Sequence, residues 1–406
     1  MTPRIIGAAM TQFGQFPDRS LAALVDEAVR ASLQDAGLAP SDVGMVMFGN
    51  ATEGVLRGQE MIRAEVLLRS SGLLGVPMFN VENACASSSS AFHLACMAVE
   101  SGSADVVLVV GAEKLTHELK ARSFGAVATA IDLAEEKEVA ESIREALFES
   151  PGPGRGLKRS PLMDFYARKT ATYLSAYGVD EQLIGEISVK NRLHGSLNPL
   201  AQFQKEVTLD EVMSSRMIVD PLRLLMCAPI GDGAAAVVVA SEEFTRRTGR
   251  SSVAVLACAS TSNGNHESAR GPVTRAARGA YEKAGLGPRD IDVAEMHDAC
   301  SAAELWLYDE LQFSVPGGSA ELIATGATRL GGRLPVNTGG GLLARGHPLG
   351  ATGCAQLVEL VDQLRGRSGA RQVEDARVAL AQTSGGILDR GDEAVCVVTI
   401  LARDDL

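Results

Sequence analysis

The chain of 406 residues has few aromatic side chains, which make up 4% of it, and a shortage of positive charge. It carries 38 lysines and arginines against 50 acidic residues, so its net charge is −12. Such an acidic chain repels nucleic acid and anionic membrane surfaces, and neither is expected as its main partner. No apolar run approaches the roughly 18 residues of a membrane-spanning helix, and residues 1–14 lack the basic and apolar regions of a signal peptide.

Cysteine is also sparse and scattered. The seven cysteines are odd in number, and they form no Cys-x-x-Cys pair and no cluster with histidine. This pattern argues against a disulfide framework and against a structural zinc site. Together with the missing signal peptide, it predicts a protein of the reducing cytoplasm. The cysteines are Cys85, Cys96, Cys227, Cys258, Cys300, Cys354 and Cys396.

What the chain does contain is the balance of an ordinary globular protein, with 46% hydrophobic and 22% charged residues. β-Branched runs alternate with amphipathic helical patterns, which predicts an α/β fold. The length suits two or three domains, or one large duplicated domain. Strands are predicted at 4–10, 43–49, 76–81, 105–111, 234–240, 253–259, 291–296 and 394–401, and helices at 20–36, 91–99, 134–150 and 273–284.

An internal repeat favours the duplication. AGLAPSDV at residues 36–43 is matched by AGLGPRDI at residues 284–291, and each copy ends a helix, turns at proline and opens a strand. The expected halves are residues 1–245 and 250–406. Residues 115–218, roughly, do not fit the repeat and are predicted to be an excursion over one face, where a substrate would be covered, with the Gly- and Pro-rich residues 151–156 as a surface linker.

The first candidate for chemistry is Cys85, in the run Asn-Ala-Cys-Ala-Ser at residues 83–87. It follows a predicted strand and precedes a predicted helix. Unpaired backbone N–H groups and the positive end of a helix dipole favour the thiolate, which is the nucleophilic form. A small buried cysteine in a serine-rich cap is the alternative that this segment alone leaves open.

The second candidate is His347, in Gly-His-Pro-Leu-Gly-Ala-Thr-Gly at residues 346–353, shortly after Asn-Thr-Gly-Gly-Gly at 337–341. Many glycines indicate a close approach of the backbone to a ligand, and the histidine can serve as a base. The third candidate is the cluster His297, Asp298 and Cys300, just past a strand end, where sites lie in α/β sheets. Three residues so close together cannot all point at one ion, so no metal site is expected.

Taken together, these segments resemble the thiolase superfamily over essentially the whole chain. The nucleophile segment and the histidine loop carry the resemblance, and 220–223 (DPLR) and 231–235 (GDGAA) add to it. The His297–Asp298 pair is similar to the sterol-carrier-protein-type and archaeal branch, where other thiolases carry Asn-Glu. The resemblance implies two βαβαβαββ halves in a five-layered α-β-α-β-α core, with a loop domain on top.

Two positions depart from the family pattern. Ser384 stands where most thiolases carry a second cysteine as acid/base. The sterol-carrier-type branch places a cysteine directly after His-Asp, but here that residue is Ala299 and the cysteine comes one residue later, at Cys300. A one-residue shift points the side chain elsewhere on a regular element. Cys300 and His297 are therefore both open as the second acid/base.

The activity implied is a reversible thiolysis or Claisen condensation of 3-oxoacyl-CoA through an acyl-cysteine, with coenzyme A as co-substrate and no bound cofactor or metal. Cys85 would be the nucleophile and His347 its base. His297 with His347 would bind the enolate oxygen. The Cys85 backbone N–H, with a glycine near Gly386, would hold the tetrahedral oxygen.

Three alternatives stay open. A retro-aldolase of the same superfamily would cleave a hydroxyacyl-CoA without needing Cys85. A decarboxylating ketosynthase would share the cysteine but not the GHPLGATG loop. A non-catalytic CoA-binding scaffold would have lost Cys85 or His347, and both are present.

The expected partners are acyl-CoA or CoA and a second copy of the chain, as a homodimer or tetramer. Members of this branch with a similar C-terminal segment resemble subunits that work with a small zinc-ribbon/OB-fold protein. No basic run obviously grips the CoA phosphates. The alternative is that scattered cations of the excursion, Arg155, Lys158 and Arg159, bind these phosphates and the chain needs no partner.

Overall fold

The computed structural model describes residues 2–148, 157–264, 271–388 and 392–405. Its strands form one hydrogen-bonded series in the order β3-β2-β4-β7-β1-β8-β11-β10-β9, beside a small β5-β6 hairpin. The strands are β1 Arg4–Met10, β2 Met45–Gly49, β3 Met78–Val81, β4 Val106–Lys114, β5 Met217–Val219, β6 Leu222–Arg223, β7 Asp232–Ala240, β8 Val253–Ser262, β9 Val293–Glu295, β10 Val378–Leu388 and β11 Asp392–Arg403.

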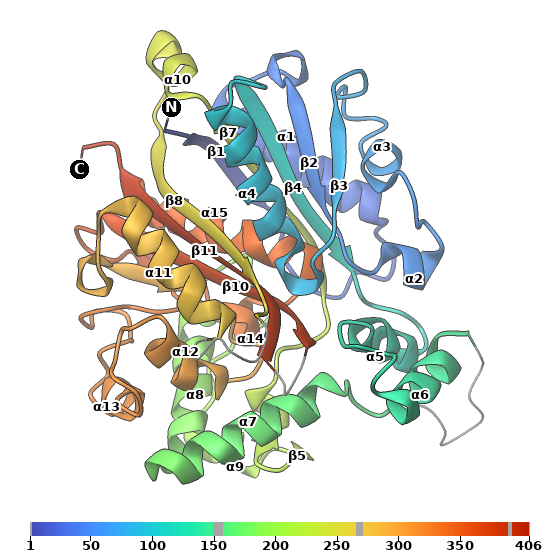
Figure 1. Ribbon diagram of the computed structural model, residues 1–406, viewed down its shortest axis with the longest axis vertical. Coiled ribbons are helices and arrows are strands. Elements are labelled where there is room, and N and C mark those ends of the chain that lie inside the picture. Colours follow the sequence, from blue (N-terminus) through green and yellow to red (C-terminus); the bar gives the residue numbers. More distant parts are fainter. Residues whose placement is uncertain (1, 149–156, 265–270, 389–391, 406) are drawn as a thin grey trace.

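Helices cover both faces of this series (Figure 1). They are α1 Leu21–Ala36, α2 Glu53–Arg57, α3 Arg63–Leu67, α4 Ser87–Glu100, α5 Lys120–Ala128, α6 Lys137–Phe148, α7 Leu162–Tyr177, α8 Gln182–Ser196, α9 Leu209–Ser214, α10 Glu242–Thr248, α11 Pro272–Ala284, α12 Ala303–Glu310, α13 Ser319–Ala324, α14 Gly341–Arg345 and α15 Thr352–Leu364. None of the helices in the described ranges is long and apolar enough to cross a membrane.

The sheet consists of two halves that are joined only at their edges. β1 pairs with β8 through two residues, Arg4 with Ala254 and Ile5 with Val253. α1 packs on the outer face of the first half and α11 on the outer face of the second half. α4 and α15 lie between the halves and share one hydrophobic cluster with strands of both. This gives the expected five layers, with helices on both outer faces and in the middle.

Burial on both faces explains the uniformly apolar strands. β4 (VVLVVGAEK) and β7 (DGAAAVVVA) are buried at every position. A strand covered by helices on each side has no solvated face, so it reads as a continuous apolar run instead of an alternating one. The sequence therefore predicts these two central strands well, to within two or three residues at each end.

The repeat seen in the sequence has the same conformation in both halves. α1 ends at Gly37 and α11 ends at Gly285, both left-handed, with φ of 62° and 69°. A 3-10 turn follows each: Pro40–Asp42 and Pro288–Asp290. In each turn the aspartate accepts a backbone N–H from three residues upstream at 2.8 Å. The repeat is thus a helix–turn–strand connection that is used twice.

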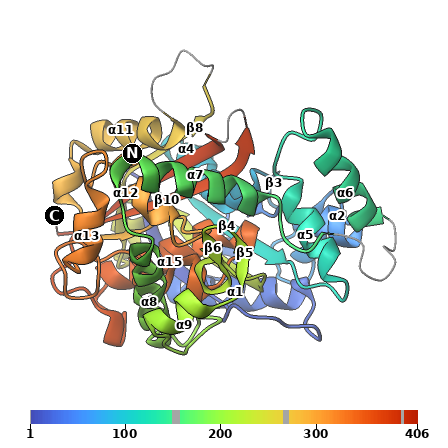
Figure 2. The same ribbon diagram turned by 90° about the horizontal axis from the view of Figure 1, so that it is seen from below.

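The segment between β4 and β7 is helical. It holds α5 to α9 and the β5-β6 hairpin, and it lies across one end of the sheet (Figures 1 and 2). The charged helix expected at 134–150 is α6, Lys137–Phe148. The expected linker at 151–156, which includes Arg155, lies outside the described residues.

Candidate active site

Cys85 lies in a tight turn between β3 and α4. The turn is a 3-10 helix, Ala84–Ala86, and Ala84 adopts a left-handed φ of 49°, which is uncommon for a residue other than glycine. The Cys85 side chain is buried, with 7% of its surface exposed. A non-glycine residue held in this conformation indicates strain that the surrounding packing supports, as is frequent at functional sites.

Small residues let the two central helices approach each other at this turn. A Cβ added to Gly353 at the start of α15 would lie 2.0 Å from Ser89 Oγ of α4. A Cβ added to Gly111 would lie 2.4 Å from the Gly350 carbonyl oxygen and 2.6 Å from Ser88 Cβ. The glycines and serines of both motifs therefore serve close packing, which brings the histidine loop against the Cys85 turn.

His347 contacts Cys85 directly. Its Nε2 lies 3.3 Å from Cys85 Sγ, and its Nδ1 lies 2.7 Å from Thr352 Oγ1. The Thr352 hydroxyl donates its own proton to the Pro348 carbonyl oxygen at 3.0 Å. It can then only accept from the imidazole, so Nδ1 carries the proton and the Nε2 lone pair faces the thiol. The loop sets the tautomer that a base for Cys85 needs.

The resting pair is neutral. Burial raises the pKa of the Cys85 thiol to about 12, and the Glu113 carboxylate adds to the rise. Burial, with His297 and Arg345 nearby, lowers the pKa of His347 well below its usual value. The sequence predicts that the helix start favours the thiolate. Desolvation is the largest influence on the pKa of this buried thiol and favours the neutral form, and α4 itself begins only at Ser87.

His297 lies close to both Cys85 and His347, so the three side chains form one group. One donor atom from each of Cys85, His297 and His347 lies within 4.8 Å of the others. The two imidazole rings meet edge to face with centroids 5.1 Å apart. The backbone N–H of His297 donates to Gln382 Oε1 at 3.0 Å, whereas its ring Nε2 is buried and has no hydrogen-bond partner among the described residues.

Burial lowers the pKa of His297 to about 4, so this imidazole is neutral as well. A buried polar nitrogen without a partner is costly in a folded protein, and a ligand oxygen would satisfy it. Cys85, His297 and His347 are also the one set of three donors in the described ranges that could hold a metal ion such as zinc.

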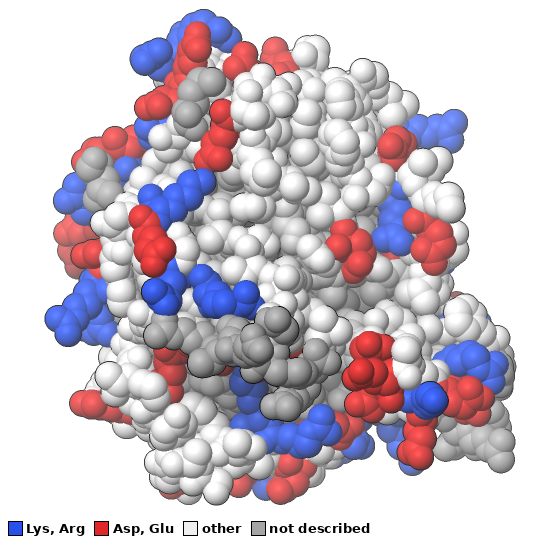
Figure 3. Space-filling view, in the orientation of Figure 1, with Lys and Arg blue, Asp and Glu red and all other residues white. Residues whose placement is uncertain are grey.

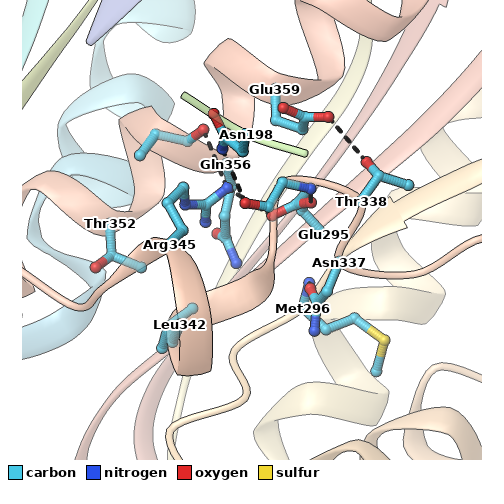
Figure 4. Close-up of polar contacts among 12 residues, drawn as sticks. Asn198, Glu295, Met296, Asn337, Thr338, Leu342, Arg345, Thr352, Gln356 and Glu359 are labelled. Atoms are coloured by element: carbon cyan, nitrogen blue, oxygen red, sulfur yellow. Dashed lines mark hydrogen bonds and ion pairs between the residues drawn. The ribbon is translucent and has the colours of Figure 1, made fainter. Parts of the chain in front are cut away.

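A buried polar network fixes the segments around these side chains (Figure 4). Arg345 pairs with Glu295 at 2.7 Å, and Glu295 also accepts the Gly339 N–H at 3.0 Å. Asp298 accepts the Leu342 N–H at 2.7 Å. A carboxylate from each side of His297 therefore holds the chain just before the histidine loop. This is the structural role of the Asp in the His-Asp pair.

The remaining predicted residues are not part of this group of three donors. Cys300 is fully buried and pairs across a β-bridge with Cys227. Ser384 accepts a hydrogen bond from Gln382 Nε2 at 2.8 Å. Gly385 lies against the Cys85 turn, since a Cβ there would be 2.1 Å from the Asn83 carbonyl oxygen. Gly386, with φ of 63°, faces the Ala130 carbonyl oxygen instead.

Three positioning residues were not identified from the sequence: Thr352, Gln382 and Glu113. Thr352 lies inside the quoted loop, five residues after His347, and only the folded turn shows that its hydroxyl reaches the ring. Gln382 lies two residues before Ser384 on β10. Glu113 accepts hydrogen bonds from Asn50, Thr52 and the Gly350 N–H. No sequence spacing joins it to the site, because its partners come from distant segments.

Comparisons with known proteins cover nearly the whole chain. The N-terminal domain model of thiolase matches residues 4–243, and the thiolase C-terminal domain-like model matches 257–399. An acetyl-CoA acetyltransferase from Methanothermobacter thermautotrophicus is 37% identical, with 94% of this chain and 96% of that protein covered. Sterol carrier protein 2 from Bos taurus is 36% identical, covering 94% of this chain and 69% of that protein.

A solved structure described as "Ltp2-ChsH2(DUF35) aldolase" is similar as well. It superposes with a TM-score of 0.79 at 26% identity, covering 99% of this chain and 98% of that one. The similar proteins thus include an acyltransferase and an aldolase, built on one fold.

Proposed function

The chain belongs to the thiolase family of acyltransferases, and we propose that it cleaves or forms 3-oxoacyl-CoA through an acyl group carried on Cys85. The observation that carries the proposal is the 3.3 Å contact between Cys85 Sγ and the His347 Nε2 lone pair. A nucleophile within hydrogen-bond reach of a base, which is itself oriented by a third group, is the arrangement that covalent catalysis requires.

In the cleavage direction, Cys85 Sγ attacks the 3-keto carbon while its proton passes to His347 Nε2. The tetrahedral intermediate collapses, the bond between C2 and C3 breaks, and the acetyl-CoA enolate leaves. It takes a proton at carbon from the His347 imidazolium. CoA-SH then attacks the acyl-Cys85 thioester, its proton passes to His347, and the Cys85 sulfur leaves and is reprotonated. One imidazole closes the proton balance of both half-reactions.

The negative charge on oxygen forms beside neutral donors. The His297 imidazole, neutral and unpartnered at Nε2, supports its role as donor to the enolate oxygen. The Cys85 backbone N–H and a glycine of the Gly385–Gly386 pair would hold the tetrahedral oxygen. Loss of one such donor typically costs about 10²–10³-fold in rate.

A retro-aldolase is the second candidate, favoured by the similarity to the aldolase structure. Cys85 separates the two activities, because aldol cleavage of a 3-hydroxyacyl-CoA needs no acyl-enzyme. The test is to incubate the purified chain with acetoacetyl-CoA and CoA, and separately with a 3-hydroxyacyl-CoA alone. We expect CoA-dependent formation of acetyl-CoA that Cys85→Ala abolishes. Aldol cleavage that persists in Cys85→Ala would favour the aldolase, and binding without turnover of either compound would favour a scaffold.

We also propose that the chain forms a homodimer through the free edge of β3. In the part of the chain that the structure describes, this edge strand has a strand partner on one side only, and Phe79 on it is 48% exposed. Figure 3 shows a broad face with little charge over α4 and the neighbouring strands, where Leu94 and Met97 are exposed on α4. An open apolar edge strand is a site for pairing with a second copy.

Light scattering tests the dimer. Phe79→Asp is expected to give a monomer, whereas Val315→Asp, at a 74% exposed site between α12 and α13, is the matched control and keeps the dimer. A wild-type chain that is monomeric at micromolar concentration would contradict the proposal.

A small second protein is a further part of the proposed assembly. The support is the aldolase structure, whose description names a DUF35 partner. Within the described part of the predicted phosphate-binding group, Arg159 is engaged in an ion pair with Asp164 at 2.6 Å. The test is to assay thiolysis by the pure homo-oligomer with and without an added zinc-ribbon/OB-fold protein. If the added protein does not increase the rate, this partner is removed from the proposal.

A further inference from the structure

Two cysteines outside the group formed by Cys85, His297 and His347 face each other across an isolated antiparallel bridge. Cys227 and Cys300 are the paired residues. The Ala228 N–H donates to the Ala299 carbonyl oxygen at 3.0 Å, and the Ser301 N–H donates to the Met226 carbonyl oxygen at 2.8 Å. The two hydrogen bonds therefore flank the cysteine pair and do not join the cysteines themselves.

This pattern fixes the distance between the two residues. In an antiparallel ladder, a pair flanked by its hydrogen bonds has Cα atoms about 4.5 Å apart and side chains on the same face. A disulfide needs Cα atoms about 4.4–6.8 Å apart. We propose that Cys227 and Cys300 are a modification site for thiol oxidants, which convert this pair into a cross-strand disulfide without moving the backbone.

The exposure of the pair sets the order of events. Cys300 is fully buried, whereas Cys227 is partly exposed. A peroxide oxidises Cys227 to the sulfenic acid and leaves as water. The Cys300 sulfur then attacks the Cys227 sulfur and a second water leaves. In sum, two thiols and one hydrogen peroxide give one disulfide and two waters.

The reaction is expected to be slow and selective. Burial raises the pKa of Cys227 to about 12, so little thiolate is present at neutral pH. Among the described residues, no other two cysteines are partners in a β-bridge. Cys85 faces His347, Cys258 pairs with Thr399, and Cys396 pairs with Ser384 and Thr261. The proposal does not depend on the reaction assigned to Cys85.

Peptide mapping of the full chain tests the proposal. The protein is treated with hydrogen peroxide, quenched, unfolded, alkylated and digested. We expect a loss of 2 Da and a cross-linked peptide pair containing Cys227 and Cys300, reversed by dithiothreitol. The oxidised chain should also unfold a few degrees higher, because the cross-link restricts the unfolded chain.

Two variants remove the cysteine pair, and a third serves as the control. Cys227→Ser and Cys300→Ser should each abolish the cross-link and the rise in unfolding temperature, whereas Cys354→Ser should leave both unchanged. Three results with the wild-type protein would overturn the proposal. Both thiols could remain open to alkylation after unfolding, Cys227 could be oxidised to the sulfinic acid without a cross-link, or either cysteine could cross-link to a different partner.

Discussion

Helices α4 and α15 lie in the same central layer between the two sheet halves, and each begins directly after a 3-10 turn. The turn before α4 carries Cys85, and the segment just before the turn of α15 carries His347. α15 is buried along nearly its whole length, whereas α4 leaves Leu94 and Met97 exposed. His347, the proposed base, thus lies beside a helix that is buried in the core, whereas the helix after Cys85, the proposed nucleophile, has exposed apolar side chains.

The two helices illustrate how a duplicated fold can divide a reaction between its halves. Burial raises the pKa of Cys85, so a helix start alone does not favour its thiolate. In the proposed reaction, the imidazole of His347 from the other half removes the proton when the substrate is attacked. Under this proposal each half supplies a group that does little without the other, and close packing at Gly353 and Ser89 joins them.

Removing the nucleophile should have the largest effect. Cys85→Ala is expected to lower thiolysis by about 10³-fold or more, because no acyl-enzyme can form. Mass spectrometry after incubation with acyl-CoA should show an adduct on Cys85 of the wild type and none in the variant. An adduct found on Cys300 and never on Cys85 would overturn the assignment.

Removing the base from the other half comes next. His347→Ala is expected to lower thiolysis by about 10²–10⁴-fold and to slow iodoacetamide alkylation of Cys85 at pH 7. The reason is that a thiol with a pKa of about 12 needs the imidazole to give up its proton. His117→Ala, at a histidine outside the site, is the control. Alkylation at the wild-type rate would show that His347 does not activate the thiol.

Acid should destabilise the fold through His297. Its pKa is about 4 when folded and about 6.5 when unfolded, so the unfolded chain binds more protons below pH 6.5. The free energy of unfolding should fall on the order of 3 kcal/mol from this group between pH 6.5 and 4. Urea titrations compare wild type with His297→Gln, which should lose less stability over that window. Identical pH slopes would contradict the lowered pKa.

A smaller effect is expected when the tautomer is no longer set. Thr352→Val keeps the shape of the side chain but removes the hydroxyl that accepts from His347 Nδ1. Loss of one such bond predicts a fall of about 10-fold in kcat/KM. Thr352→Ser should restore the rate, and Thr352→Val should alter the pH profile of Cys85 alkylation. A purely structural role would leave that profile unchanged while lowering the unfolding temperature.

The smallest effect is expected at Cys300. Cys300→Ser should leave thiolysis within about threefold, because Cys300 pairs with Cys227 and does not belong to the group of Cys85, His297 and His347. Steady-state assays with acetoacetyl-CoA measure it, with Cys354→Ser as the control. A drop comparable to that of His347→Ala would return Cys300 to the acid/base chemistry.

The α/β class, the central apolar strands and the helix–turn–strand repeat can be predicted from the sequence alone. These follow from local rules, because continuous apolar runs and Gly-Pro punctuation act over a few residues. The sequence also points to Cys85, His297 and His347, through motifs that resemble a family. The structure confirms the fold and places these three side chains together.

The neighbours of each functional group depend on how distant segments pack in the folded chain. Cys85 and His347 lie 262 positions apart in the chain, and their 3.3 Å contact depends on the packing of α4 against α15. Three further features also depend on the folded conformation. They are the Thr352 contact that sets the tautomer, the bridge that pairs Cys300 with Cys227, and the burial that keeps Cys85 a thiol. Protonation depends on desolvation and on charges from distant segments, and no spacing along the chain encodes these.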